Sequence, residues 1–175
     1  MNTILFIVGA PGVGKTTLVR RLLEPDSFFN VKPKWTIGLN GLVCAAGHYT
    51  GGTFDGADTV PYNGFLPALQ HWKEHLSDFK LTILDGDRFS DKRSVEFFQT
   101  HGVRQKVLHC IASSELLAER RNQRGSTQNP SWMKGRETKS TRFATDLFSP
   151  EDNRLILQMH EAPEDLERRV RKWLR

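Results

Sequence analysis

One segment near the start of the chain constrains the fold more than any other: residues 9–17 read Gly-Ala-Pro-Gly-Val-Gly-Lys-Thr-Thr. The segment follows a short apolar run at residues 3–8 and precedes an amphipathic stretch that begins at Lys15. Gly, four residues and then Gly-Lys-Thr, between a strand and a helix, is the pattern of a phosphate-binding loop. A glycine-rich turn that binds nothing is the alternative, and the flanking strand and helix argue against it.

Each residue type in this segment suits a polyphosphate ligand. Glycines allow positive φ angles and a close approach of the backbone to an anion, and the N-terminus of the following helix favours negative charge. Lys15 is expected to reach the β- and γ-phosphates of ATP or GTP, and the Thr16 hydroxyl to ligate Mg²⁺. The predicted nucleotide-binding residues are Gly9, Pro11, Gly12, Val13, Gly14, Lys15, Thr16 and Thr17.

Composition is that of an ordinary globular protein. A chain of 175 residues, 38% hydrophobic and 26% charged, suits a single domain spanning residues 1–175. It has no run of 18 apolar residues and no basic, apolar leader, so we expect neither a membrane span nor a signal peptide. Cys44 and Cys110 lie far apart in apolar segments and are expected to be buried thiols in a reducing cytoplasm.

The net charge of +5 is unevenly distributed. Residues 101–144 hold nine Lys or Arg and three Glu, a net charge of +6, so the rest of the chain sums to −1. A localised positive field indicates a polyanionic partner. Nucleotide phosphates fit this description, and a nucleic-acid backbone is a further candidate.

Apolar and amphipathic segments alternate along the chain. Strands are predicted at residues 3–8, 35–46, 81–84, 105–111 and 154–159, the second with a hairpin-type Asn40-Gly41 dipeptide inside it. Helices are predicted at residues 15–24, 65–79 with Asn63 as cap, 90–100, 114–124 and from 163 onward. Residues 26–34 and 47–59 are expected to be loops, and the polar, basic residues 126–140 to be mobile. This order predicts an α/β fold, doubly wound around a five-stranded parallel-core sheet.

A second constellation, Asp85-Gly86-Asp87-Arg88, follows a predicted apolar strand. A carboxylate at the end of a strand beside a phosphate-binding loop can orient Mg²⁺, so Asp85 is the predicted metal ligand that accompanies Thr16. Asp87 has two interpretations, a substrate ligand or a cap for the next helix. Arg88 either holds a phosphate or pairs with Asp87 or Asp91.

The glycine-rich loop at residues 47–59 leaves a strand at the edge of the sheet where ligands of open α/β folds bind. Phosphoryl transfer to a hydroxyl benefits from a carboxylate that orients the hydroxyl and accepts its proton, and Asp55 and Asp58 are candidates. The alternative is an Asp-Gly turn with two solvated carboxylates. His48 and Tyr49 either stack on a base or anchor the loop.

Three arginines, Arg120, Arg121 and Arg124, lie at the end of a predicted helix and lead into a basic lid at about residues 120–145. Arg120 and Arg124 share one helix face, and guanidinium groups on a closing lid can stabilise the charge of a transferred phosphoryl group. A solvated helix face is the alternative. Trp132, an aromatic residue in a polar stretch, either docks the lid or stacks on a nucleobase.

Together these segments resemble the nucleoside-monophosphate-kinase-like group of P-loop kinases. Within that group, Gly47-His48-Tyr49 and Gly56-Ala57-Asp58-Thr59 are similar to a set, largely bacteriophage-encoded, that phosphorylates 5-hydroxymethyl groups on pyrimidines in DNA. The resemblance implies a P-loop kinase fold. The roles it implies are ATP and Mg²⁺ binding by Lys15 and Thr16, action of Asp58 at the acceptor hydroxyl, and action of Arg120 or Arg124 at the transferred phosphate.

Comparison with the motifs of other nucleotide-binding proteins reduces the number of candidate classes. No Asn-Lys-x-Asp motif is present, which argues against a GTPase, and the chain is too short for an AAA-type ATPase. Asp87-Arg88-Phe89 partly matches thymidylate kinases, yet the segment after the first helix lacks a convincing Arg for a nucleoside monophosphate.

The leading hypothesis is an ATP- and Mg²⁺-dependent kinase whose acceptor is 5-hydroxymethyluracil in DNA. The predicted catalytic residues are Lys15, Asp58, Asp85, Arg120 and Arg124, and the predicted substrate ligands are His48, Tyr49, Asp55, Asp87 and Arg88. Any of Asp55, Asp58 and Asp87 is a candidate general base. A kinase of a free nucleotide, nucleoside or sugar, and a nucleotide-dependent switch or binding module, are the other hypotheses. We expect a cytoplasmic protein, in the host cytoplasm if phage-encoded, without an obligate protein partner.

Overall fold

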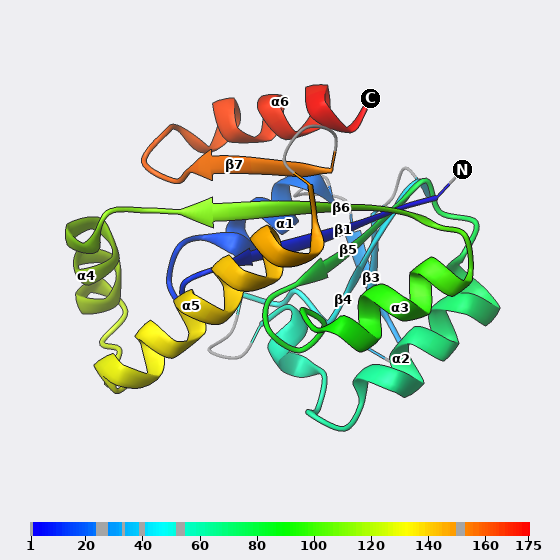
Figure 1. Cartoon of the computed structure of the whole chain (residues 1–175), viewed down its shortest axis with the longest axis horizontal. Coiled ribbons are helices and arrows are strands. Elements are labelled where there is room, and N and C mark those ends of the chain that lie inside the picture. The colour runs from blue at the N-terminus through cyan, green and yellow to red at the C-terminus, as the bar shows by residue number, and fades with distance from the viewer. Residues whose placement is uncertain (1, 24–27, 33, 39–40, 52–54, 150–152) are drawn as a thin grey trace.

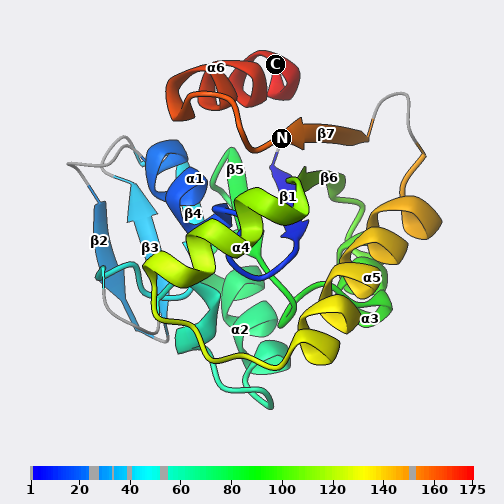
Figure 2. The ribbon, with the colours of Figure 1, turned by 90° about the vertical axis from the view of Figure 1, so that its left-hand side faces the viewer.

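The computed structural model describes residues 2–23, 28–32, 34–38, 41–51, 55–149 and 153–175. Its strands form one seven-stranded sheet with helices on both faces (Figures 1 and 2). The strands are β1 (Thr3–Gly9), β2 (Phe28–Val31), β3 (Trp35–Gly38), β4 (Val43–Ala46), β5 (Leu81–Asp85), β6 (Arg104–Ile111) and β7 (Arg154–Gln158). The helices are α1 (Lys15–Leu22), η1 (Ala57–Thr59), α2 (Phe65–His71), η2 (Trp72–Leu76), α3 (Lys92–Thr100), α4 (Ser114–Gln123), α5 (Pro130–Leu147) and α6 (Pro163–Leu174).

The strand order is β2-β3-β4-β5-β1-β6-β7. The five neighbouring strands from β4 to β7 in this order run parallel, which confirms the predicted α/β fold with a parallel-core sheet. In β1, at the centre, Ile7 lies opposite Asp85 of β5, and Gly9 lies opposite Cys110 of β6. The segments that follow β1 and β5 therefore meet at one edge of the sheet.

Alternation along β1 divides the core into two layers. Ile4, Phe6 and Val8 face α2, α3 and α5. There Phe6 makes edge contacts with Phe98 and Phe143. Leu5 and Ile7 face α1 and α6 on the other side. Because both faces of the central strand are covered, its sequence is a continuous apolar run.

The antiparallel edge of the sheet differs from the sequence prediction. β2 occupies part of the segment expected to be a loop, and within residues 35–46, where the sequence has a hairpin-type dipeptide, β3 and β4 form an antiparallel pair. Gly41, at φ 65°, precedes β4, whereas Asn40 lies outside the described residues. Helix α1 ends at Leu22, and the predicted end at Glu24 also lies outside them.

Helix α5 corrects the expectation that residues 126–140 are mobile. Asn129 caps the helix through its side-chain oxygen, which accepts from the next N–H groups, and Pro130 occupies the first turn. Met133, Ser140, Phe143 and Ala144 are buried along one side. These sparse residues recur at helical spacing, so burial against the sheet stabilises a helix that its polar composition did not indicate.

Two predicted caps are also wrong. Helix α2 begins after Gly64 without a side-chain cap, so Asn63 does not cap it. Asp91 rather than Asp87 caps α3, because its Oδ1 accepts from the N–H of Ser94 at 2.9 Å. No helix within the described ranges is long and apolar enough to cross a membrane.

Candidate functional site

The loop after β1 has the geometry of an anion cradle. Gly9, Gly12 and Gly14 all adopt positive φ, at 153°, 82° and 108°. A Cβ at Gly9 would lie 2.3 Å from the carbonyl oxygen of Cys110, so this position also requires glycine for space. Helix α1 starts directly afterwards at Lys15, and its N-terminal N–H groups face the loop.

Lys15 reaches back over this loop. Its Nζ donates to the carbonyl oxygens of Gly9 at 3.0 Å and Ala10 at 3.1 Å. Carbonyls are neutral partners for an ammonium group, so a bound phosphate would replace them with a stronger charge-assisted contact. The lysine is therefore held at the cradle in a conformation that an anion can take over.

Thr16 and Asp85 meet beside Lys15, as the sequence predicts. Thr16 Oγ1 donates to Asp85 Oδ2 at 3.4 Å. Asp85 is only 4% exposed, and its Oδ1 has no hydrogen-bond partner among the described residues. Burial raises the pKa of Asp85 to about 6, and the Lys15 charge partly opposes this increase.

A buried, unpartnered carboxylate oxygen next to a hydroxyl is a donor set that suits Mg²⁺. No group of three or more His, Cys, Asp or Glu side chains suited to a metal occurs among the described residues. Thr16 and Asp85 therefore fit a magnesium ion whose remaining ligands are phosphate oxygens and water, as in P-loop sites.

The glycine-rich loop is closed at its base by backbone contacts. Gly47 has φ 101°, and a Cβ there would lie 2.0 Å from the carbonyl oxygen of Gly56. The Gly56 N–H donates to the His48 carbonyl at 2.8 Å. These two glycines are therefore required by the close approach of the two chain segments; residues 52–54, at the tip, lie outside the described part of the chain.

His48 and Tyr49 are anchors of this loop, which corrects the base-stacking interpretation. His48 Nε2 lies 2.9 Å from the Val31 carbonyl oxygen. Tyr49 is buried in the core layer on the α1 side, so its ring offers no face to a base. Its hydroxyl has no hydrogen-bond partner within the described structure.

The two aspartates of the loop differ in their surroundings. The Asp55 side chain is 12% exposed, forms an ion pair with Arg20 of α1 and accepts from the Thr50 N–H. The Asp58 side chain is 70% exposed, and its Oδ1 lies 3.7 Å from Nε of Arg88. Asp58 is thus the accessible carboxylate, and its charge contributes to the raised pKa of Asp85.

Asp87 and Arg88 join the loop after β5 to other elements. Arg136 of α5 donates from Nη1 to Asp87 Oδ2 at 2.9 Å and from Nη2 to the Tyr62 hydroxyl at 3.3 Å. The Arg88 guanidinium lies over the Tyr62 ring, 4.1 Å from its centroid. Among the described residues, the buried Nη1 of Arg88 has no hydrogen-bond partner, and Nε has only the Asp58 carboxylate, at 3.7 Å. An unsatisfied buried guanidinium nitrogen is costly, so Arg88 is equipped to receive an anion.

Arg120 and Arg121 of α4 both lie against the phosphate-binding loop. Arg120 donates from Nη1 to the Val13 carbonyl and from Nη2 to the Met159 carbonyl, both at 2.7 Å, so it ties the phosphate-binding loop to the segment after β7. Arg121 packs over the loop, with Cγ 3.7 Å from a Cβ position on Gly12. Its Nε is buried without a hydrogen-bond partner in the described part of the chain, a feature that helical spacing alone did not indicate.

Arg124 is exposed and lines a cavity of about 290 Å³ between α1, α4 and the start of α6. Gly14, Thr17, Arg120, Met159 and Pro163 also line it. The cavity adjoins the phosphate-binding loop through Gly14 and Thr17. Its mixture of apolar and guanidinium surface suits a planar, polar group attached to the phosphates.

Comparisons with known proteins agree with this geometry. A family model described as P-loop Nucleotide Kinase3 matches residues 1–173. A comparison with curated proteins finds no match.

Several solved structures share the fold at low sequence identity. A sugar kinase from Janibacter is similar over 99% of this chain and 95% of its own, with a TM-score of 0.56 and 15% identity. A gluconokinase from Sinorhizobium meliloti is similar over 99% and 91%, with a TM-score of 0.57 and 12% identity. A deoxyadenosine kinase from M. mycoides with bound dATP is similar over 98% of both chains, with a TM-score of 0.56 and 10% identity.

Proposed function

Because this chain belongs to the P-loop nucleotide kinase family, we propose that it transfers the γ-phosphoryl group of ATP to the hydroxyl of 5-hydroxymethyluracil in DNA. The observation that carries the proposal is the meeting of Asp58, Asp85 and Arg88 near Lys15 at one edge of the sheet. One carboxylate there suits the metal and another is free for an acceptor.

The donor side of the site explains how the phosphates would be held. Backbone N–H groups of the loop and Lys15 Nζ bind the β- and γ-phosphates, and the cavity lined by Arg124 receives the base. Thr16 and Asp85 would hold a magnesium ion, which would supply positive charge beside the phosphates. Arg121, with its unpartnered Nε beside Gly12, stabilises charge on the transferred group.

On the acceptor side, Asp58 is assigned as the residue that orients the hydroxymethyl oxygen and accepts its proton. It has the accessible carboxylate, whereas Asp55 is bound by Arg20 and Asp87 by Arg136. Arg88 is assigned to a phosphate group of the acceptor, because its buried Nη1 has no hydrogen-bond partner in the described structure. Positioning and charge stabilisation supply most of the catalysis in this type of reaction.

The choice of a hydroxymethylated pyrimidine in DNA is supported by the loop resemblance around Gly47 and Asp58 and by the positive charge of residues 101–144. A substituent on pyrimidine C5 lies in the major groove of a duplex, so its hydroxyl is accessible from outside the base pair. Since Tyr49 is buried, a flipped base would stack instead on Tyr62 or Trp132, both exposed. This acceptor also places the protein in a cytoplasm, the host's if the chain is phage-encoded.

The test offers radiolabelled ATP and Mg²⁺ with three acceptors in parallel: an oligonucleotide with 5-hydroxymethyluracil, the same oligonucleotide with thymine, and a mixture of free nucleosides, nucleotides and sugars. Label on the hydroxymethylated oligonucleotide alone supports the proposal. Label only on small molecules would replace it with a small-molecule kinase. Slow ATP hydrolysis without any labelled acceptor would favour a nucleotide-dependent switch.

A further inference from the structure

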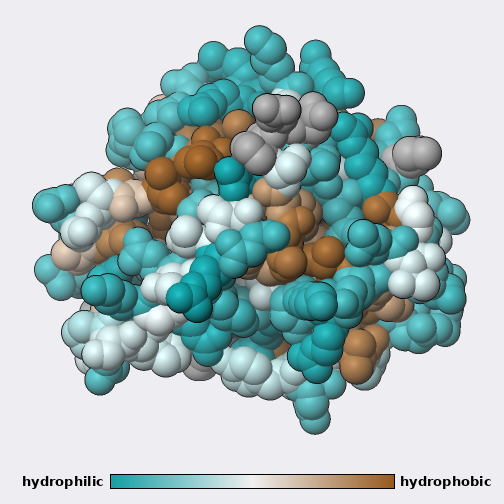
Figure 3. Space-filling view, in the orientation of Figure 1, coloured by the Kyte–Doolittle hydropathy of each residue, from teal (hydrophilic) through white to brown (hydrophobic). Residues whose placement is uncertain are grey.

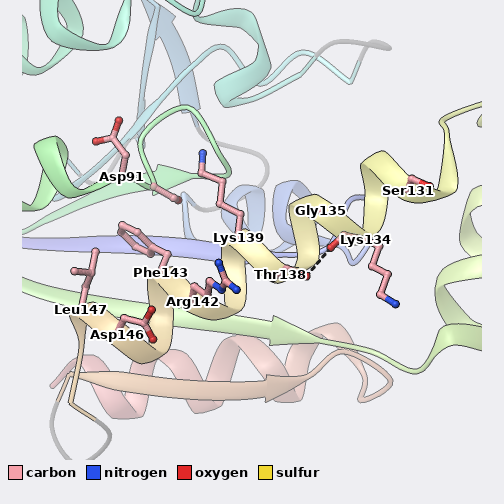
Figure 4. Close-up of a pocket in the computed structure, with 11 residues that line it drawn as sticks. Asp91, Ser131, Lys134, Gly135, Thr138, Lys139, Arg142, Phe143, Asp146 and Leu147 are labelled. Carbon is pink, nitrogen blue, oxygen red and sulfur yellow. Dashed lines mark hydrogen bonds between the residues drawn. The ribbon is translucent and has the colours of Figure 1, made fainter.

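A shallow groove of about 670 Å³ runs along α5, outside the donor site (Figure 4). Ser131, Lys134, Gly135, Thr138, Lys139 and Arg142 line it from the helix, and Ser90 and Asp91 from the segment after β5. The face of the molecule that carries α5 is largely hydrophilic, with apolar residues between the charged ones (Figure 3).

The helix that lines the groove also contacts the acceptor side of the site. Lys139 Nζ donates to the carbonyl oxygen of Asp87 at 3.3 Å, and Arg136, one turn earlier on α5, pairs with the Asp87 carboxylate. A substrate larger than a single nucleotide that places its hydroxyl at Asp58 can therefore extend from the site along α5.

The side chains that line the groove carry more positive than negative charge. Lys134, Lys139 and Arg142 are exposed and form no ion pair in the described structure. Of the two acids, Asp91 caps α3 and pairs with Arg93, whereas Asp146 keeps its charge and accepts from the Thr145 hydroxyl at 2.8 Å. Three cations along one helix against one unpaired carboxylate give the groove a net positive charge that suits a polyanion.

Aromatic side chains accompany these cations near the N-terminal end of α5. Trp132, 43% exposed, has the Arg136 guanidinium 5.0 Å from its ring centroid. The exposed Tyr62 lies within reach of the same arginine. Alternating cations and exposed aromatic rings are typical of surfaces that bind an unpaired nucleic-acid strand.

We infer that this groove binds the sugar–phosphate backbone of the DNA strand that carries the acceptor base, with Lys134 and Arg142 on two phosphates of one strand and Trp132 stacked on a base. The inference rests on the proposed function, since it concerns how a polymeric acceptor is held. Eight residues separate Lys134 from Arg142, about 12 Å along the helix axis. At about 3.4 Å of rise per nucleotide, this distance covers roughly three to four phosphates.

The test uses the double variant Lys134→Ala/Arg142→Ala and a control, Lys73→Ala/Arg104→Ala, that removes the same two residue types elsewhere. All four positions are exposed and without an ion pair in the described ranges. Binding of a single-stranded oligonucleotide with 5-hydroxymethyluracil is measured over a range of salt concentrations, with the KM values for the oligonucleotide and for ATP. Since each phosphate contact contributes a slope of about 0.7, the groove variant should lose about 1.4 from the slope of log affinity against log salt.

The expected result is this loss of slope together with a raised KM for the oligonucleotide, an unchanged KM for ATP, and a control variant that behaves as wild type. If the slope of log affinity against log salt is the same in both variants and DNA is still phosphorylated, the groove does not bind the DNA strand, while the proposed function stands. If the wild-type protein neither binds nor phosphorylates the oligonucleotide, both the groove inference and the proposed function are wrong. Loss of folding is monitored by the thermal transition of each variant.

Discussion

Arg20 of α1 and Asp55 of the glycine-rich loop form an ion pair that joins the nucleotide-binding helix to the loop carrying Asp58. The Asp55 carboxylate is mostly buried and also accepts from the Thr50 N–H. Asp55 is therefore a positioning residue for the loop, while Asp58, three residues later, keeps an exposed carboxylate. The sequence left Asp55 and Asp58 as equal candidates for the general base. The ion pair with Arg20 distinguishes them, because it engages Asp55 and leaves the Asp58 carboxylate exposed.

This division predicts different kinetics for two isosteric variants. Asp58→Asn should lower kcat by about 10²–10⁴-fold with little change in the KM for ATP, because the group that accepts the acceptor proton is lost. Asp55→Asn should chiefly raise the KM for the acceptor and keep most of kcat, since only the loop position is loosened. Steady-state kinetics on the acceptor identified by labelling separates the two. Equal losses of kcat in both variants would contradict the assignment.

The buried carboxylate of Asp85 is expected to lower the stability of the folded protein while it serves as a metal ligand. Burial raises its pKa from an ordinary value of 3.8 to about 6, so the folded state binds the proton more tightly than the unfolded state. The resulting stabilisation is complete below about pH 3.8 and is lost as pH rises through about 6; above that, the buried charge is unfavourable by about 3 kcal/mol.

Asp85→Asn should therefore raise the thermal transition of the nucleotide-free protein at pH 8 in EDTA, and the gain should shrink as the pH is lowered through 6. The same variant should lose the stabilisation that Mg²⁺ adds to ATP binding, because the second metal ligand is gone. Thermal denaturation with and without ATP and Mg²⁺ measures both effects. A variant less stable than wild type at pH 8 would show that the charge is compensated in the native protein.

The neighbouring arginines of α4 should respond in opposite ways. Arg120→Ala removes two hydrogen bonds to carbonyls of different segments, so it should lower the thermal transition and weaken ATP binding together. Arg121→Ala removes no hydrogen bond of Nε, and should lower kcat by about 10²–10³-fold at nearly unchanged stability. Denaturation curves and kcat for both variants decide this, and a large loss of stability in Arg121→Ala would assign that residue to the fold.

Gly9 should be intolerant of any side chain, because a Cβ there would overlap the Cys110 carbonyl. Gly9→Ala should destabilise the protein by several kcal/mol or prevent folding. Gly135, in α5, has no atom within 4 Å of a Cβ position, so Gly135→Ala should be neutral or stabilising by up to about 1 kcal/mol. Chemical denaturation of the two variants tests the contrast, and similar stabilities would mean that the loop adapts.

Buried thiols were correctly predicted from the apolar surroundings of Cys44 and Cys110, which are both free and buried. Burial raises the pKa of each thiol to about 12. The α/β class and the parallel core were also predictable, because the phosphate-binding loop and the apolar strands are local patterns. The antiparallel strands β2 and β3 were not, since edge pairing depends on partners distant in the sequence.

The sequence by itself determined the nucleotide-binding loop, because Gly9–Thr17 carries its conformation and its chemistry within nine adjacent residues. It also predicted that Asp85, at the end of a strand, lies beside Thr16 of the phosphate-binding loop and helix. Only the tertiary structure decided that α5 is an ordered helix, that Asp55 is mostly buried in an ion pair with Arg20 whereas Asp58 stays exposed, and that Arg121 faces the loop. These outcomes depend on which side chains meet across the fold, and pairing between distant residues leaves no local pattern in the chain.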